Sequence, residues 1–209
     1  MGRAFDVRGG RHEGTNRHWG PQSVVPCVGP GITLTVVKAP QDRIEADLLV
    51  DDLDLGIAFS GSHLSGINAT PLFAEALTLV AAARHAATAD KDPVPVQALS
   101  GQQLALLDGD FATRRHVDAY FSPHRVRPRI IVEANSVQAL AVSAHRLATV
   151  LPQAIAYDHA RLVSIPLDPP LPTRTVTLLT RADAYQSAAA RALTHLTHGH
   201  VRARAYDPG

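Results

Sequence analysis

Apolar residues in the first half of the chain are spaced as a strand, a helix and a second strand. The strand at 32–37 is a β-branched apolar run that follows a Gly-Pro-Gly sequence. In the helix at 42–50, Ile44 and Leu48 are four residues apart and share one face. The second strand occupies 53–59. This succession predicts a βαβ unit, whose two strands run parallel.

The same alternation continues through the rest of the chain. Apolar residues at Leu77, Leu79 and Val80 predict a strand within 71–82, and the polar stretch 88–95 is a candidate boundary between lobes. Further strands are predicted at 104–107, 129–134, 147–151, 163–167 and 175–179, and helices at 113–121, 137–144 and 183–195. Strands that alternate with helices in this way are typical of the α/β class.

The first thirty residues do not share this pattern. They are rich in Gly, Arg and His and contain almost no periodic apolar residues, so we expect a disordered arm over 1–30. A basic arm could contact nucleic acid, but Asp6 and Glu13 are interspersed among its arginines, which favours a solvated tail.

Charge and cysteine content narrow the range of partners. Twenty Lys and Arg against nineteen Asp and Glu leave a net charge of +1, too little to attract a nucleic-acid backbone over a broad surface. One cysteine, Cys27, excludes an internal disulfide and fits a reducing compartment. No apolar stretch reaches the length of a signal-peptide core or a membrane span, so we expect a cytoplasmic protein without a membrane partner.

Four short strings in a fixed order carry a family resemblance. They are PQDR at 40–43, LDLGI at 53–57, PLFAE at 71–75 and LATVLP at 147–152. In this order they resemble the effector-sensing domain of LysR-type transcription regulators, over about residues 31–196. Three further strings resemble the subgroup that includes cyanate-operon regulators: FATRR at 111–115, EANS at 133–136 and PLDPPLP at 166–172.

The resemblance implies a two-lobed, periplasmic-binding-protein-like (type 2) α/β fold with a small molecule held between the lobes. Lobe I would comprise residues 31–89 and 166–198, lobe II residues 90–165, and a C-terminal tail residues 199–209. The implied function is sensing of a small-molecule effector, such as a carboxylate or another anion, in the regulation of transcription. The resemblance also implies a homo-oligomer and no cofactor.

Two parts of the family pattern are absent from the sequence of residues 1–30. No winged helix-turn-helix is found there, so we expect DNA contact only through a missing domain. The family's opening strand and helix are not found either, and we expect an incomplete first lobe whose neighbouring strands lack a partner. A stand-alone cytoplasmic binder of a small anion or metabolite is the alternative function.

Residues at strand ends and helix starts are the candidate ligand contacts, because the resemblance places them facing the cleft. They are Gln41, Phe59, Ser60, Thr113, Asn135 and Ser136. The hydroxyl and amide groups among them suit hydrogen bonds to a small carboxylate, although each residue could instead serve a local cap or turn. Arg114 and Arg115 could add positive charge, but an arginine in the first turn of a helix more often points to solvent.

The sequence indicates neither a metal site nor a catalytic site. His195, His198 and His200 have no Cys, Asp or Glu close by to complete a zinc site, so we expect them to be solvated. Cys27 lies in the unpatterned segment without a neighbouring base. Neither a phosphate-binding glycine loop nor a nucleophile elbow is found, and we expect no enzymatic activity.

Overall fold

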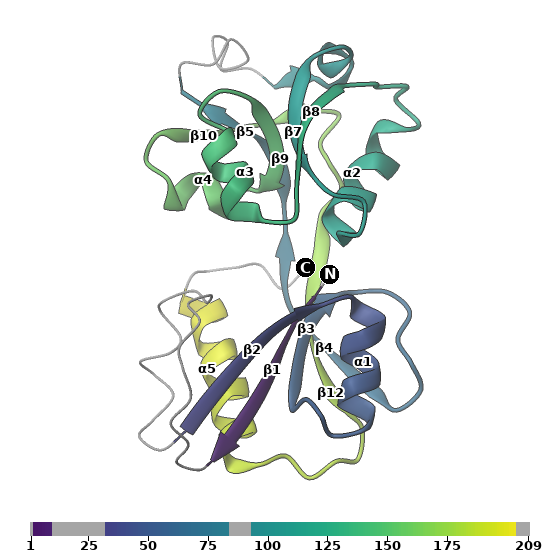
Figure 1. Ribbon diagram of the computed structural model, residues 1–209, viewed down its shortest axis with the longest axis vertical. Coiled ribbons are helices and arrows are strands. Elements are labelled where there is room, and N and C mark those ends of the chain that lie inside the picture. The colour runs from purple at the N-terminus through teal and green to yellow at the C-terminus, as the bar shows by residue number, and fades with distance from the viewer. Residues whose placement is uncertain (1, 10–31, 84–92, 204–209) are drawn as a thin grey trace. The chain divides into compact units, whose positions relative to one another are not determined.

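The computed structural model describes residues 2–9, 32–83 and 93–203. The chain divides into two compact units, one formed by residues 1–74 with 174–209 and the other by residues 75–173. The chain therefore passes between the units twice. Each unit is built around a five-stranded β-sheet with α-helices packed on it, which confirms the predicted α/β class (Figure 1).

The sheet of the first unit has the strand order β2-β1-β3-β12-β4. Its elements are β1 (Gly2–Gly9), β2 (Ile32–Ala39), α1 (Gln41–Leu49), β3 (Leu55–Phe59), β4 (Ile67–Glu75), β12 (Arg174–Arg181) and α5 (Ala188–Ala203). β1 is antiparallel to both β2 and β3, so those two strands run in the same direction. The predicted strand–helix–strand unit is thus present, with β1 between its strands.

Strand β1 corrects two predictions about the start of the chain. Its residues pair with β2 along its whole length and with β3 from Arg3 to Phe5. The expectation that these neighbouring strands lack a partner is therefore wrong, and so is the expectation of a disordered arm over residues 2–9. Backbone pairing on both sides forms this strand, and backbone pairing needs no alternating apolar pattern. The remainder of the predicted arm, including Cys27, lies outside the described residues.

Two apolar clusters pack against opposite faces of the first sheet. Ile44 and Leu48 of α1 are buried against Leu179, whereas Leu193 of α5 packs with the adjacent Leu178. Neighbouring strand residues point to opposite faces, so α1 and α5 cover different sides of the sheet. The predicted apolar face of α1 is confirmed.

The sheet of the second unit has the strand order β10-β5-β9-β7-β8. The strands are β5 (Leu77–Ala82), β6 (Val94–Pro95), β7 (Gln103–Leu107), β8 (Arg129–Ala134), β9 (Ala148–Pro152), β10 (Leu162–Ile165) and β11 (Leu167–Asp168). The helices are the 3-10 helix η3 (Val96–Leu99), α2 (Ala112–Phe121), α3 (Val137–Ser143) and α4 (Ala154–Asp158). β7 is parallel to both β8 and β9, and β11 pairs in parallel with β6.

The boundaries between the two units differ from the expected lobe boundaries, 89/90 and 165/166. The division falls at 74/75 and 173/174. Strand β5 pairs with β9 and β10, which keeps residues 77–82 in the second unit. Leu167 and Leu171 belong to the same buried cluster as Leu104 and Val150, so the segment after β10 also stays there.

The last helix begins and ends later than the predicted 183–195. Asp183 has a φ of 56°, in the left-handed region, which interrupts a helix. The Ser187 hydroxyl oxygen accepts a hydrogen bond from the Ala190 backbone N–H at 3.0 Å, and α5 begins at Ala188. His200 therefore belongs to α5 and not to the expected tail. Within the described part of the chain, no helix has the length and apolar character needed to cross a membrane.

Candidate ligand-binding site

The predicted ligand contacts fall into two sets, one in each unit. Gln41, Phe59 and Ser60 belong to the first unit, and Thr113, Asn135 and Ser136 belong to the second. All of them lie at the carboxyl end of a strand or at the start of the helix that follows it. The carboxyl ends of parallel strands are where open α/β sheets bind ligands.

In the second unit, two neighbouring parallel strands bring one set together. Leu107 at the end of β7 is paired with Ala134 at the end of β8, and the Asp108 N–H donates to the Ala134 carbonyl oxygen at 3.1 Å. The chain after β7 leads into α2, and the chain after β8 leads through Asn135 into α3. Thr113 and Asn135 therefore follow adjacent strand ends.

Ser136 and Thr113 differ in their local roles. Ser136 is the N-cap of α3, and its hydroxyl oxygen accepts a hydrogen bond from the Ala139 N–H at 3.4 Å. The N-cap of α2 is Phe111, which makes no side-chain cap bond, and Thr113 is the buried second residue of that helix. The capping role that was the alternative is thus seen at Ser136, whereas Thr113 lies inside α2.

Arg114 does not point to solvent, contrary to the sequence-based expectation. Only 13% of its side chain is exposed. Its guanidinium donates to the Leu107 carbonyl oxygen at 2.8 Å, to Glu133 at 2.6 Å and to Asp118 at 3.0 Å. Burial alone would lower the pKa of Arg114, but these two carboxylates raise it above its usual value. Its charge is balanced within the protein, which leaves little of it for an anionic ligand.

In the first unit, Gln41 belongs to a hydrogen-bonded cluster around a buried carboxylate. Glu45 is 3% exposed and accepts hydrogen bonds from the Leu64 N–H at 2.7 Å, from His63 Nδ1 at 2.8 Å and from the Gln41 amide at 2.8 Å. Burial alone would raise the pKa of Glu45, but these donors outweigh it and hold the pKa below its ordinary value. The cluster fastens the loop after β3 to the first turns of α1.

Glu45 and His63 were not among the predicted site residues. Glu45 follows the buried Ile44 in α1, and its position four residues after Gln41 was an available helical signal. His63 is eighteen residues further along and meets Glu45 only in the folded chain.

Phe59 and Ser60 mark the end of β3. The Arg174 guanidinium lies 3.6 Å from the centroid of the Phe59 ring, a cation–π arrangement. The Ser60 N–H donates to the Thr175 carbonyl oxygen at 2.8 Å. Both residues are therefore positioned by β12, whose strand returns the chain to this unit.

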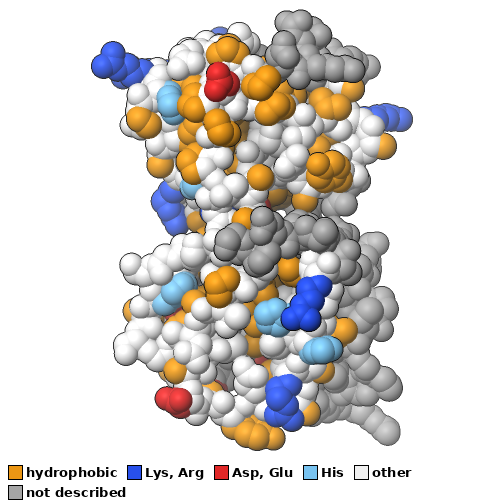
Figure 2. Space-filling model, turned by 180° about the vertical axis from the view of Figure 1, so that it is seen from behind, with side chains coloured by type: hydrophobic (Ala, Val, Ile, Leu, Met, Phe, Trp, Pro, Cys, Tyr) orange, Lys and Arg blue, Asp and Glu red, His pale blue; other side chains and the backbone are white. Residues whose placement is uncertain are grey.

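Charged groups are dispersed over the face shown in Figure 2, where lysine, arginine and acidic side chains stand singly among apolar and uncharged ones. Among the residues that the structure describes, no group of three or more His, Cys, Asp or Glu side chains is arranged to hold a metal ion.

The sequence profile of the LysR substrate binding domain matches residues 28–202 of the chain. The chain belongs to this family. The match extends over both units except β1, and it confirms the predicted kind of domain, the effector-binding domain of LysR-type regulators. It also confirms the fold, which LysR effector-binding domains share with type 2 periplasmic binding proteins.

Solved structures of LysR proteins have the same fold as this domain. The effector binding domain of QuiR in complex with shikimate has a TM-score of 0.65 and 18% identity, with 79% of each chain covered. The regulatory domain of Synechocystis CcmR in complex with 2-PG has a TM-score of 0.65 and 19% identity, with coverage of 78% of this chain and 81% of that one. HinK, a LysR family regulator from Pseudomonas aeruginosa, has a TM-score of 0.63 and 15% identity, and the match spans 79% of this chain but 59% of HinK.

Proposed function

We propose that this LysR domain binds a small-molecule effector, a carboxylate or another small anion, through the polar residues that follow its parallel strands. The observation that carries the proposal is the placement of Thr113, Asn135 and Ser136 after the adjacent parallel strands β7 and β8. QuiR and CcmR, whose domains have the same fold, are described in complex with shikimate and with 2-PG, which supports a small-molecule ligand.

The second unit supplies uncharged hydrogen-bond donors to such a ligand. The first backbone N–H groups of a helix such as α2 are not used within the helix and carry partial positive charge. Thr113 and Asn135 add a hydroxyl and an amide, while the charge of Arg114 is held by Glu133 and Asp118. In the first unit, Ser60 offers a hydroxyl, the Gln41 amide already donates to Glu45, and Phe59 offers only an apolar ring. We therefore expect neutral donors, more than arginine, to recognise the anion.

Membership of the LysR family supports a proposal about the wider setting of the domain. We propose that it serves transcription regulation in the cytoplasm as a homo-oligomer, with promoter recognition assigned to a separate helix-turn-helix domain and not to this part of the chain. The strings at 111–115, 133–136 and 166–172 favour the cyanate-regulator subgroup. Binding of a small molecule, and not catalysis, is the activity proposed for the site.

Calorimetric titration with a panel of small carboxylates, phosphorylated acids and uncharged sugars tests this function. At least one anion should bind with a stoichiometry of one per chain and raise the unfolding temperature, because a ligand that binds only the folded state stabilises it. Conversion of a panel member to another product, or binding confined to the uncharged sugars, would contradict the proposal.

A further inference from the structure

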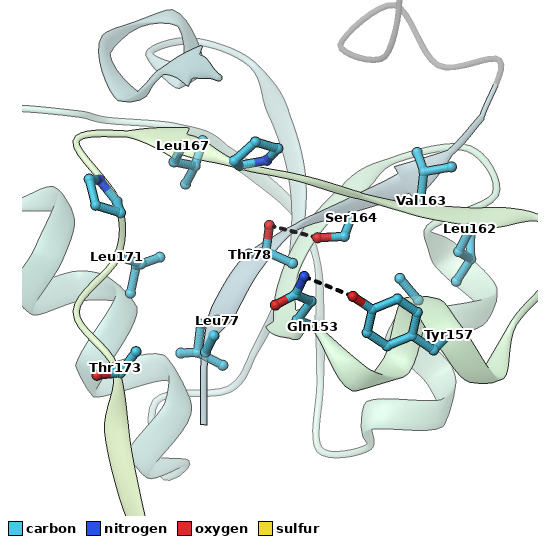
Figure 3. A pocket seen from close by; sticks show the side chains of 14 residues that line it. Leu77, Thr78, Gln153, Tyr157, Leu162, Val163, Ser164, Leu167, Leu171 and Thr173 are labelled. Carbon is cyan, nitrogen blue, oxygen red and sulfur yellow. Dashed lines mark hydrogen bonds between the residues drawn. The ribbon is translucent and has the colours of Figure 1, made fainter. Parts of the chain in front are cut away.

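The second unit contains a pocket that is separate from the predicted effector contacts. Its volume is about 600 Å³, within the range of pockets that hold small molecules. Strands β5 and β10, helix α4 and the segment from Pro166 to Thr173 line it (Figure 3). None of the six predicted ligand contacts is among the lining residues. The pocket is therefore a distinct candidate site.

The lining is apolar with a few uncharged polar groups. Leu77, Leu167 and Leu171 border the open space in Figure 3. No Lys, Arg, His, Asp or Glu is among the fourteen residues that line the pocket. The exposed Tyr157 leaves one side of the pocket open to water, and a charged ligand would lose part of its hydration on the apolar side without gaining an opposite charge, which is unfavourable. The lining selects against the small anions proposed for the effector site.

Two hydrogen-bonded pairs supply the polar part of the pocket. The buried Thr78 hydroxyl donates to the Ile165 carbonyl oxygen at 2.6 Å and accepts from the Ser164 hydroxyl at 3.2 Å. The Gln153 amide donates to the Tyr157 hydroxyl at 3.1 Å (Figure 3). A glutamine amide also carries an acceptor oxygen and a second N–H, so this pair can hydrogen-bond an uncharged polar group.

Hydrogen bonds from residues outside the pocket hold the segment from Pro166 to Thr173 in place. The Tyr120 hydroxyl donates to the Pro169 carbonyl oxygen, and His116 Nε2 donates to the Pro172 carbonyl oxygen at 2.8 Å. The Val94 N–H donates to the Pro166 carbonyl oxygen at 2.8 Å. These contacts hold the leucines of the segment in place before any ligand arrives, which lowers the entropic cost of binding.

We propose that this pocket binds one uncharged, mainly apolar small molecule, with its polar group near Gln153 and Tyr157. Ring systems or branched hydrocarbons with a hydroxyl, ester or amide group fit the volume and the lining. The site is a second ligand site of the domain, and its lining differs in chemistry from the predicted effector contacts.

A matched pair of fluorescent probes tests the charge selectivity of the pocket. N-phenylnaphthylamine is uncharged, and anilinonaphthalene sulfonate has the same ring framework with an added negative charge. In titrations of the full chain, the uncharged probe should bind saturably at one site and at least about tenfold more tightly than the sulfonate. Equal affinities, or no saturable binding of the uncharged probe, would overturn the proposal.

Variants that fill the pocket locate the probe. Ala156→Leu in α4 and Ala76→Leu before β5 each place a larger side chain in the lining. Each should weaken binding of the uncharged probe by more than about tenfold. Ala119→Leu makes the same change at an exposed position of α2 and should leave the affinity unchanged. Circular dichroism and thermal unfolding identify which variants are folded. Because the two filling substitutions lie in different elements, the test remains possible if one variant does not fold.

The outcome separates this proposal from the proposed function. Equal binding of the uncharged probe to wild type and to a folded fill variant places the probe elsewhere and overturns the pocket site. Asn135→Ala changes an effector contact outside the pocket and should leave probe binding unchanged. Loss of probe binding in the fill variants with intact anion binding supports two sites, whereas failure of anion binding alone affects only the effector proposal.

Discussion

At the scale of single residues, the buried carboxylate of Glu45 should make stability depend on pH. Glu45→Gln keeps the shape of the side chain but removes the charge that accepts three hydrogen bonds. We expect a loss of about 1–3 kcal/mol in the free energy of unfolding at neutral pH. Chemical denaturation of both proteins at a series of pH values measures it.

The direction of the pH effect follows from the lowered pKa. Because the pKa of Glu45 in the folded chain lies below its ordinary value of 4.5, its stabilisation is fully present above that value. The stabilisation is lost as the pH falls below 4.5 through the lowered pKa, so the difference between wild type and Glu45→Gln should shrink there. Asp42→Asn, an exposed change in the same helix, is the control. Parallel pH profiles for wild type and Glu45→Gln would contradict the account.

At the scale of elements, Gly56 sets the distance between α1 and β3. A Cβ atom at this position would lie 2.7 Å from Ile44 Cγ2 and 3.3 Å from Leu179 Cβ. Gly56→Ala should therefore destabilise the chain by about 1–3 kcal/mol through overpacking. Thermal and chemical unfolding of the variant measure the loss. The glycine of the LDLGI string thus has a packing role.

A second substitution distinguishes overpacking from a backbone effect. Ile44→Leu moves the branch away from Cβ and removes Cγ2, so the double variant Gly56→Ala/Ile44→Leu should be more stable than Gly56→Ala alone. Gly109→Ala, with no atom within 4 Å of the added Cβ, should change stability little. No recovery in the double variant would argue against the close contact as the cause.

Elements with a strong local pattern could be predicted from the sequence, and those formed by distant pairing could not. Strand β8 has the predicted bounds, 129–134, and α2 has the predicted buried residues Val117, Tyr120 and Phe121. Strand β1 was missed because its ladder with β2 and β3, and not an apolar alternation, defines it. The unit boundaries were misplaced because β5 could have paired in either sheet, which only its contacts with β9 and β10 decide.

The same distinction applies to the candidate site. Positions after strands and before helices are local features, and the residues predicted there occupy such positions. The ion pairs of Arg114 with Glu133 and the bond of Glu45 with His63 join residues far apart in the sequence. The sequence pattern of a single helix or strand therefore does not predict these contacts.

At the scale of the whole molecule, open sheet edges favour association of two chains. β8 is an edge strand of the second sheet and exposes Ile131 at 45%. Unpaired edge strands readily pair with other chains. We expect sedimentation at tens of micromolar to show a dimer. Ile131→Lys should weaken this dimer. Val50→Lys changes an exposed residue at the end of α1 and should leave the dimer intact. A strict monomer for wild type would count against pairing.

We propose that a small-molecule effector contacts the residues that follow the parallel strands of the second unit. Asn135→Ala removes an exposed amide after the carboxyl end of β8, and Gln103→Ala removes an exposed amide at the amino end of β7. The direct test is calorimetric affinity for the anion identified in the panel, measured with the unfolding temperature of each variant. Asn135→Ala should weaken binding by about tenfold or more while the variant stays folded, and Gln103→Ala should bind as wild type does. Unchanged affinity in Asn135→Ala, or an equal loss in both variants, would contradict the account.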